Sequence, residues 1–231
     1  MIRAVIIANK RTGGTFLSWG LSNHPNIHCE RGEILHPRHP MRAYMVGSNL
    51  EWIKMILSAQ FYQVSMCKLV YDQALVPDIW NYLCEIQPHI VWLRRENLLR
   101  QAVSLYLAKF ARRIHSYADL PAEKIQIETN ALIATMAGLE EYNQTMEEAL
   151  GAMEHVLPVT YAEITGTDNA SEMNETAGRR VCAFLGVSYY PMRTALKRVN
   201  PFPLCETLSN WTEIETALKD TRFSAFLDGN E

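Results

Sequence analysis

Short apolar segments alternate with amphipathic segments along most of the chain, and this alternation constrains the fold more than any other feature. Four runs have the length and the apolar, β-branched composition of strands. They are Ile2–Ala8, Val64–Val70, His89–Leu93 and Val156–Tyr161. The first run is continuously apolar from Ala4 to Ala8 instead of alternating with polar residues, which is typical of a parallel strand buried on both faces. Segments with helical periodicity separate the runs, so the sequence predicts βαβ units and a mainly parallel sheet flanked by helices.

The predicted helices lie between and after these strands. They cover Phe16–Leu21, Leu50–Phe61, Pro77–Ile86, Leu98–Ala111, Asn130–His155, Ser171–Leu185 and a short segment from Glu213. The longest contains Gly138 and Gly151, and either glycine could interrupt it. A chain of 231 residues with 48% hydrophobic residues can form one compact domain, so we expect 1–231 to be a single domain. Within it, 111–130 reads as an insertion or lid, and 191–231 as an irregular C-terminal tail.

Charge and cysteine content narrow the range of partners. The net charge is -3 and there is no strong basic patch, so a nucleic-acid partner is not expected, and an anionic ligand must be held by a few placed cations. The five cysteines are scattered without a CxxC pair, as in proteins whose thiols stay reduced, which favours the cytoplasm. The chain begins without a signal-peptide pattern, and no apolar stretch is long enough to cross a bilayer.

The first strand runs directly into a loop with the composition of a phosphate cradle. Residues 10–15 read Lys-Arg-Thr-Gly-Gly-Thr and precede a helix. Glycines let backbone N–H groups approach an anion, and the positive end of the helix dipole adds to the attraction. The loop is not a Walker A motif because GxxxxGK[ST] is absent. The alternative interpretation is an ordinary tight turn.

A second basic loop follows the third strand. Arg94 and Arg95 come at the strand end, and Ser104 lies on the helix that follows. A guanidinium group and a hydroxyl in these positions suit a second phosphate. Ligands of parallel α/β sheets bind beyond the carboxyl ends of the strands, which is where both loops project.

Together the two loops resemble the family of sulfotransferases that use 3′-phosphoadenosine 5′-phosphosulfate, PAPS. RTGGTFL is similar to the 5′-phosphosulfate loop of that family, and the spacing of Arg95 and Ser104 is similar to its 3′-phosphate site. RRENLLRQAVSLYLA looks most like the bacterial branch with trehalose sulfotransferase and proposed lipopolysaccharide sulfotransferases. The segments HPNIHCERGEIL, SMCKLVYDQ, LPVTYAEI and FLGV extend the resemblance from about Val5 to Val187.

The resemblance implies a P-loop-like three-layer sandwich that transfers a sulfuryl group from PAPS to a hydroxyl of a carbohydrate or glycolipid, releasing PAP, without a metal. It implies that Arg11 faces the bridging oxygen of the donor. The residues it assigns to the donor are Arg11, Thr12, Gly13, Gly14, Thr15, Phe16, Arg95 and Ser104. Phe16 stands where cytosolic members of the family have tryptophan. The Arg-Lys-Gly run of those members is absent, and Lys197 with Arg198 is the candidate substitute.

The acceptor hydroxyl must lose a proton, and the resemblance to the bacterial branch assigns Glu33 as the base. The alternative is a surface glutamate beside Arg31, and Glu30 and His36 are the other candidates for the base. Lys68 is assigned to the transferred group, or else is a solvated strand end.

Several alternatives remain open at this stage. One is a P-loop-like nucleotide kinase or phosphotransferase, and another is a non-catalytic nucleotide- or sugar-binding protein of the same fold. Four histidines between residues 24 and 39 have irregular spacing, so no metal site is expected. The acceptor pocket is expected to involve the segments 26–59 and 111–130, and the second of these could also be a homodimer contact.

Overall fold

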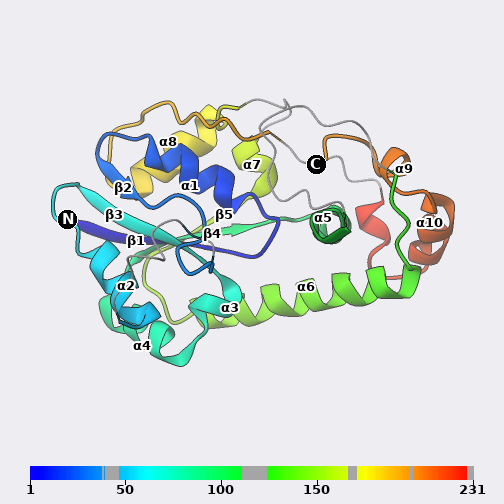
Figure 1. Ribbon diagram of the computed structural model, residues 1–231, viewed down its shortest axis with the longest axis horizontal. Helices are drawn as coiled ribbons and strands as arrows, with labels where there is room; N and C mark the ends of the chain where they lie inside the picture. Colours follow the sequence, from blue (N-terminus) through cyan, green and yellow to red (C-terminus); the bar gives the residue numbers. More distant parts are fainter. Residues whose placement is uncertain (38, 40–46, 111–123, 166–170, 198–199, 228–231) are drawn as a thin grey trace.

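A five-stranded parallel sheet forms the centre of the computed structural model, which describes residues 1–37, 39, 47–110, 124–165, 171–197 and 200–227 (Figure 1). The strand order is β2-β3-β1-β4-β5, and every neighbouring pair is parallel. The strands are β1 (Ile2–Ala8), β2 (Ile27–Cys29), β3 (Val64–Val70), β4 (His89–Arg94) and β5 (Val156–Thr160). The fold class predicted from the alternating segments, a mainly parallel sheet between helices, is confirmed.

The central position of β1 explains its continuous apolar sequence. Side chains of a strand point alternately to the two faces of a sheet. Ala4, Ile6 and Ala8 pack into the apolar cluster on one face, whereas Val5 and Ile7 pack into the cluster on the other. All five side chains are buried, so neither face of this strand could carry a polar residue without a partner.

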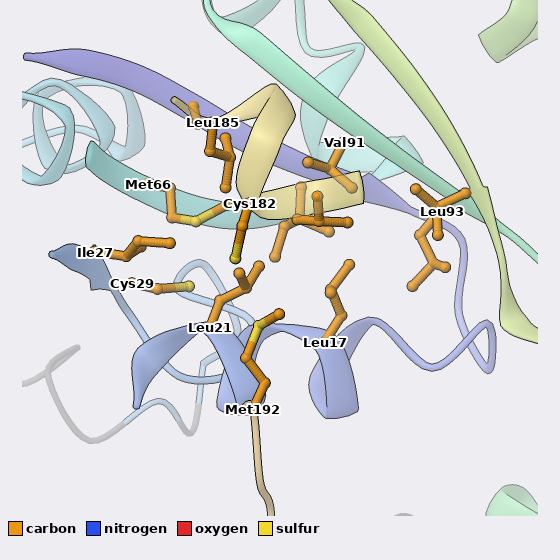
Figure 2. Packing of buried hydrophobic residues seen from close by; sticks show 14 of the residues in the cluster. Leu17, Leu21, Ile27, Cys29, Met66, Val91, Leu93, Cys182, Leu185 and Met192 are labelled. Atoms are coloured by element: carbon orange, nitrogen blue, oxygen red, sulfur yellow. The ribbon is translucent and has the colours of Figure 1, made fainter. Parts of the chain in front are cut away.

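Helices cover both faces of the sheet and give the molecule three layers (Figure 1). One face packs against α1 (Gly14–Ser22), α7 (Tyr161–Thr165) and α8 (Glu175–Phe184). Figure 2 shows the apolar core on this side, where Leu17 and Leu21 of α1 point toward the strand residues Met66 and Val91. The opposite face packs against α2 (Asn49–Leu57), α3 (Tyr71–Ala74), α4 (Pro77–Ile86) and the C-terminal end of α6 (Thr129–Leu150).

A third apolar cluster contains, among the described residues, none from the strands of the sheet. It joins α5 (Leu98–Phe110) and the first turns of α6 to α9 (Leu204–Thr207), α10 (Trp211–Lys219) and the 3-10 helix η2 (Ser224–Phe226). Leu99, Leu132, Leu208 and Ile214 are among its buried members. The region 191–231, which the sequence predicts to be mostly irregular, therefore contains helices that pack against α5 and α6. Of the predicted insertion at 111–130, residues 111–123 lie outside the described part of the chain.

Several elements differ from the sequence prediction, and two of the differences are larger than a few residues at an end. No strand was predicted between Ile2–Ala8 and Val64–Val70, but Ile27–Cys29 pairs with β3 as the short edge strand β2. Helix α6 ends at Leu150 instead of His155, because the chain turns at Gly151, whose N–H donates to the carbonyls of Glu147 and Glu148. Gly138 does not interrupt this helix.

None of the described helices combines the length and the apolar composition that a membrane-spanning helix needs.

Candidate active site

A cavity of about 770 Å³ opens at the carboxyl edge of the sheet. It is lined by the loop after β1, the start of α1, residues between 31 and 37 with His39, β3, the loop after β4, α5 and α7. Leu196, Lys197, Asn200 and Leu204 complete the described lining. Nine of the ten residues that the sequence assigned to donor binding or catalysis line it. They are Arg11, Gly13, Gly14, Thr15, Phe16, Glu33, Lys68, Arg95 and Ser104. Segments far apart in the sequence therefore meet at one site.

The loop after β1 leaves the first backbone N–H groups of α1 without a side-chain cap. The N-cap is Gly13, which has a φ of 86°, a left-handed conformation that glycine adopts without steric cost. The Thr12 hydroxyl donates to the carbonyl of Asn9 at 2.7 Å, and Thr12 does not line the cavity. Its hydroxyl therefore closes the turn instead of facing a ligand. The uncapped N–H groups and the helix dipole form a site suited to an anion.

Both glycines of the loop allow a larger side chain to pass close by. A Cβ on Gly13 would lie 2.7 Å from the Tyr161 ring, and one on Gly14 would lie 3.0 Å from Cδ of Lys68. Tyr161 and Lys68 reach the cavity only because neither glycine carries a side chain. The two glycines thus have separate steric roles.

The two basic loops are in direct contact. Arg11 Nε donates to Ser104 Oγ at 3.0 Å, and the side chain of Gln101 donates to the Lys10 carbonyl at 2.8 Å. Helix α5 is therefore tied to the first loop at two points. Gln101 is fully buried and was not singled out from the sequence.

Positive charge is concentrated where the loops meet. The Arg95 guanidinium lies over the Tyr161 ring, 4.5 Å from its centroid. Burial lowers the pKa of Arg11, and the nearby charge of Arg95 lowers it further. Two arginines held near each other create a strong local positive potential, which favours binding of an anion.

Lys68 connects the first loop to the candidate base. Its ammonium group lies 3.3 Å from Glu33 Oε1 and 3.4 Å from Thr15 Oγ1. The Lys68 side chain is only 3% exposed, so the alternative that it is a solvated strand end is wrong. Burial lowers the pKa of Lys68, while the charge and hydrogen bond of Glu33 oppose that shift. Glu33 is 26% exposed and faces the cavity through this ion pair, instead of standing on the surface beside Arg31.

The other candidates from the sequence divide into two groups. His36 and Lys10 line the cavity, although Lys10 also forms an exposed ion pair with Asp72. Glu30 does not line the cavity, and its Oε1 lies 3.7 Å from Nε2 of His28. Lys197 lines the cavity, and Arg198 lies outside the described residues.

Several lining residues were not assigned a role from the sequence. They include Asn9, Arg31, His39, Arg100, Lys109, Tyr161 and Asn200. Tyr161 follows β5 directly, so its place at a strand end was a usable signal. Arg31 and Lys109 carry no comparable signal, because an arginine or lysine in a polar segment is usually solvated.

The described residues contain no group of three or more His, Cys, Asp or Glu side chains arranged to hold a metal ion. Among the described residues that line the cavity, Glu33 is the one carboxylate, and it is bound to Lys68. The cationic side chains of this lining suit an anionic ligand.

Comparison with known proteins gives matches at the level of structure. No protein-family model matches the chain, and no curated protein sequence does. A sulfotransferase from Alicyclobacillus acidocaldarius has a TM-score of 0.55 and 14% sequence identity, with 98% of this chain and 96% of that chain covered. The mouse sulfotransferase SULT7A1, solved with PAP, has a TM-score of 0.49 and 15% identity, with 82% of this chain and 59% of that chain covered. The chain thus shares its fold with the bacterial sulfotransferase.

Proposed function

We propose that this chain is a sulfotransferase that moves a sulfuryl group from PAPS to a hydroxyl of a carbohydrate or glycolipid. One observation carries the proposal: a single cavity contains an uncapped helix N-terminus, a second cation site that contacts the first loop, and a carboxylate paired with a buried lysine. PAPS has anionic groups at both its 5′ and 3′ positions. A site with two adjacent anion-binding loops matches that distribution of charge.

The donor would be held by the two loops together. The N–H groups of residues 13–15 and the Thr15 hydroxyl would bind the 5′-phosphosulfate, while Arg95 and Ser104 would bind the 3′-phosphate. Arg11 already contacts Ser104, so it lies between these two groups. Phe16 and Tyr161 line the same cavity and offer apolar surface to the nucleoside. Thr12 contributes to the loop through its turn and its backbone.

The transfer requires one bond to form, one to break and one proton to move. The acceptor oxygen forms a bond to sulfur as the bond between sulfur and the bridging oxygen breaks, and PAP leaves. The acceptor proton passes to the Glu33 carboxylate. Negative charge grows on the bridging oxygen, where Arg11 would stabilise it, and Lys68 would stabilise the oxygens of the transferred group. Fixed cations of this kind do most of the work in the related phosphoryl transfers.

The carbohydrate or glycolipid acceptor rests on the sequence resemblance to the bacterial branch with trehalose sulfotransferase. Glu33 belongs to the segment 31–39, which lines the cavity through Arg31, His36 and His39. These polar side chains could bind sugar hydroxyls beside the base.

A kinase of similar architecture would need a carboxylate placed for Mg²⁺ beside the phosphates. Asp72 comes two residues after β3, but it is exposed, pairs with Lys10 and does not line the cavity. The remaining acid, Glu33, is held by Lys68. This arrangement favours sulfuryl transfer over Mg²⁺-dependent phosphoryl transfer.

Calorimetric titration with PAP, compared with ATP plus Mg²⁺, tests the donor. We expect PAP to bind more tightly, and binding of Mg-ATP without PAP would overturn the proposal. Incubation with ³⁵S-labelled PAPS and a panel of sugar acceptors then tests catalysis. PAP binding without transfer to any acceptor would instead support a non-catalytic nucleotide-binding protein.

A further inference from the structure

The backbone of Arg11 is held in an unusual conformation. Its φ is 64°, in the left-handed region that a residue with a Cβ adopts only at a cost in free energy. Gly13 in the same loop also has a left-handed φ, of 86°, but glycine lacks the Cβ that causes the clash. A strained residue persists only where its surroundings prevent the chain from relaxing. Contacts around Arg11 must therefore hold it in place.

Side-chain hydrogen bonds hold the main chain just before Arg11. Within the loop, the Thr12 hydroxyl donates to the Asn9 carbonyl at 2.7 Å, and the Lys10 N–H donates to Asn9 Oδ1 at 2.7 Å. A further bond comes from another element, because Nε2 of Gln101 in α5 donates to the Lys10 carbonyl at 2.8 Å. That carbonyl belongs to the planar peptide unit that joins Lys10 to Arg11, so its direction helps to set φ of Arg11. Rotating this unit to relieve Arg11 would turn the carbonyl away from Gln101.

The amide group of Gln101 is used for this one bond. Gln101 is 0% exposed, and its Oε1 has no hydrogen-bond partner among the described residues. The amide group must present its nitrogen to Lys10, since a carbonyl can only accept a hydrogen bond. A buried polar atom without a partner costs free energy, which an apolar side chain of the same size would avoid. The bond to the loop therefore accounts for Gln101 better than packing does.

Helix α5 holds both the main chain and the side chain at Arg11. Gln101 and Ser104 are three residues apart in this helix and so lie on the same face. Gln101 fixes the peptide unit before Arg11, and Ser104 Oγ accepts a hydrogen bond from Arg11 Nε at 3.0 Å. Arg11 and Ser104 line the cavity, whereas Gln101 does not. Gln101 can therefore affect a bound donor through the loop, and not by direct contact.

We infer that Gln101 is a positioning residue for the transfer: its bond to the Lys10 carbonyl keeps Arg11 in the conformation from which the guanidinium faces the bridging oxygen of the donor. The inference rests on the proposed function, because it takes Arg11 as the group that stabilises the leaving oxygen. Without the bond, the loop relaxes and the guanidinium moves away from the developing charge. The competing explanation is that Gln101 only fastens α5 to the loop and contributes to stability alone.

The first test removes the bond and measures transfer. Gln101→Met keeps the length of the side chain and loses its donor. Because a displacement of about 1 Å can lower a rate about a hundredfold, kcat should fall by roughly ten- to a hundredfold. The KM for PAPS and the Kd for PAP should stay within about threefold, since the other groups assigned to the donor are unchanged. The Tm should change by only a few degrees, because the unpartnered Oε1 is removed as well.

Transfer is measured with ³⁵S-labelled PAPS and the sugar that the acceptor panel identifies. Release of labelled sulfate to water, the transfer that needs no sugar, is followed in the same way. Calorimetric titration gives the Kd for PAP, and thermal unfolding gives the Tm. A positioning role lowers kcat alone, whereas a purely structural role lowers rate, affinity and Tm together.

The second test compares glycine with alanine at position 11. Arg11→Gly and Arg11→Ala both lack the guanidinium, but only alanine has a Cβ that clashes at a left-handed φ. With Gln101 present, Arg11→Gly should melt about 2 to 4 °C higher than Arg11→Ala. In the Gln101→Met background the loop can relax, so this difference should shrink by about half or more. The unlike entropies of glycine and alanine in the unfolded chain cancel in the comparison.

Leu132→Val is the control for a general loss of stability. Leu132 is fully buried in the apolar cluster that α5 shares with α6, and it does not line the cavity. The substitution removes a buried methylene, so it should lower the Tm by a few degrees. It should leave kcat per folded molecule unchanged.

Three results would overturn the inference: an unchanged kcat in Gln101→Met, a fall in kcat accompanied by an equal loss of PAP affinity and a large drop in Tm, or the same glycine–alanine difference in both backgrounds. The second result would mean that Gln101 only fastens α5 to the loop. If the unsubstituted chain neither binds PAP nor transfers the label, the proposed function fails, and the role of Gln101 in transfer fails with it. The glycine–alanine comparison would then still decide whether Gln101 holds the backbone of Arg11.

Discussion

Replacing Lys68 by methionine should separate catalysis from stability. The ammonium lies 3.3 Å from Glu33 Oε1, where two charges attract by roughly 5 kcal/mol at an effective dielectric constant of 20. Burying an ion costs several kcal/mol, which is about the same amount. The pKa of Lys68 is lowered, with burial as its largest cause, so the charged form carries a net penalty in the folded chain. Methionine has a similar length and can follow the same path over Gly14.

We therefore expect Lys68→Met to leave the free energy of unfolding unchanged or to raise it by about 1 kcal/mol. Glu33 loses its partner, but at 26% exposure water can solvate its carboxylate. Transfer should fall by about a hundredfold, because a lost contact to developing negative charge costs about 3 kcal/mol in the transition state. The affinity for PAP should change little, since PAP lacks the sulfuryl group that Lys68 is proposed to contact.

Three measurements check this expectation: thermal unfolding, calorimetric titration with PAP, and the rate of transfer from labelled PAPS. Lys219→Met is the matched control, because Lys219 is 60% exposed on α10 and makes only an i,i+4 ion pair with Glu215. Lys219→Met should change the melting temperature, the PAP affinity and the transfer rate very little. The reasoning is refuted if Lys68→Met lowers the Tm by many degrees and turnover falls only in proportion to the folded fraction, or if turnover is unchanged.

Four more substitutions test other parts of the molecule. Glu33→Gln should spare PAP binding and cut turnover at least a hundredfold, and an unchanged rate would exclude Glu33 as the base. By calorimetry, Arg95→Ala should weaken PAP binding by about 2 kcal/mol or more and Ser104→Ala by about 1 kcal/mol, whereas unchanged affinities would place the 3′-phosphate elsewhere. The pKa of His89 is lowered by burial and by the nearby His155. The His89 imidazole therefore binds a proton more readily in the unfolded chain than in the folded one. Stability should therefore fall as the pH drops below about 6.5, and urea unfolding of His89→Phe should show a smaller pH dependence.

The sequence predicted two long, mostly apolar strands of the sheet correctly. The observed bounds of β1 and β3 are the predicted ones, because a run buried on both faces leaves a strong signal. The edge strand β2 has only three residues, and His28 in its centre is half-buried and polar. Its extended backbone depends on pairing with β3, for example Ile27 opposite Val64, which no local pattern reveals.

The residues of the candidate site also divide into those that a local sequence pattern identifies and those that only folding brings together. The loop after β1 and the Arg95–Ser104 spacing are local patterns, so a resemblance could identify them. The ring of Tyr161 against Gly13, and the bond from Gln101 to the Lys10 carbonyl, depend on how α7 and α5 pack against the loop after β1. The ion pair between Lys68 and Glu33 likewise joins two segments that meet only in the folded chain.

The nearness of Arg11 and Arg95 also bears on how the protein should be handled. Like charges held together repel one another, and an anion that binds only the folded chain raises its stability by RT ln(1 + [L]/Kd). Phosphate or sulfate buffers should therefore raise the melting temperature relative to chloride at equal ionic strength. We also expect adenine nucleotides to accompany the protein through purification, so a preparation stripped of them would be the least stable form.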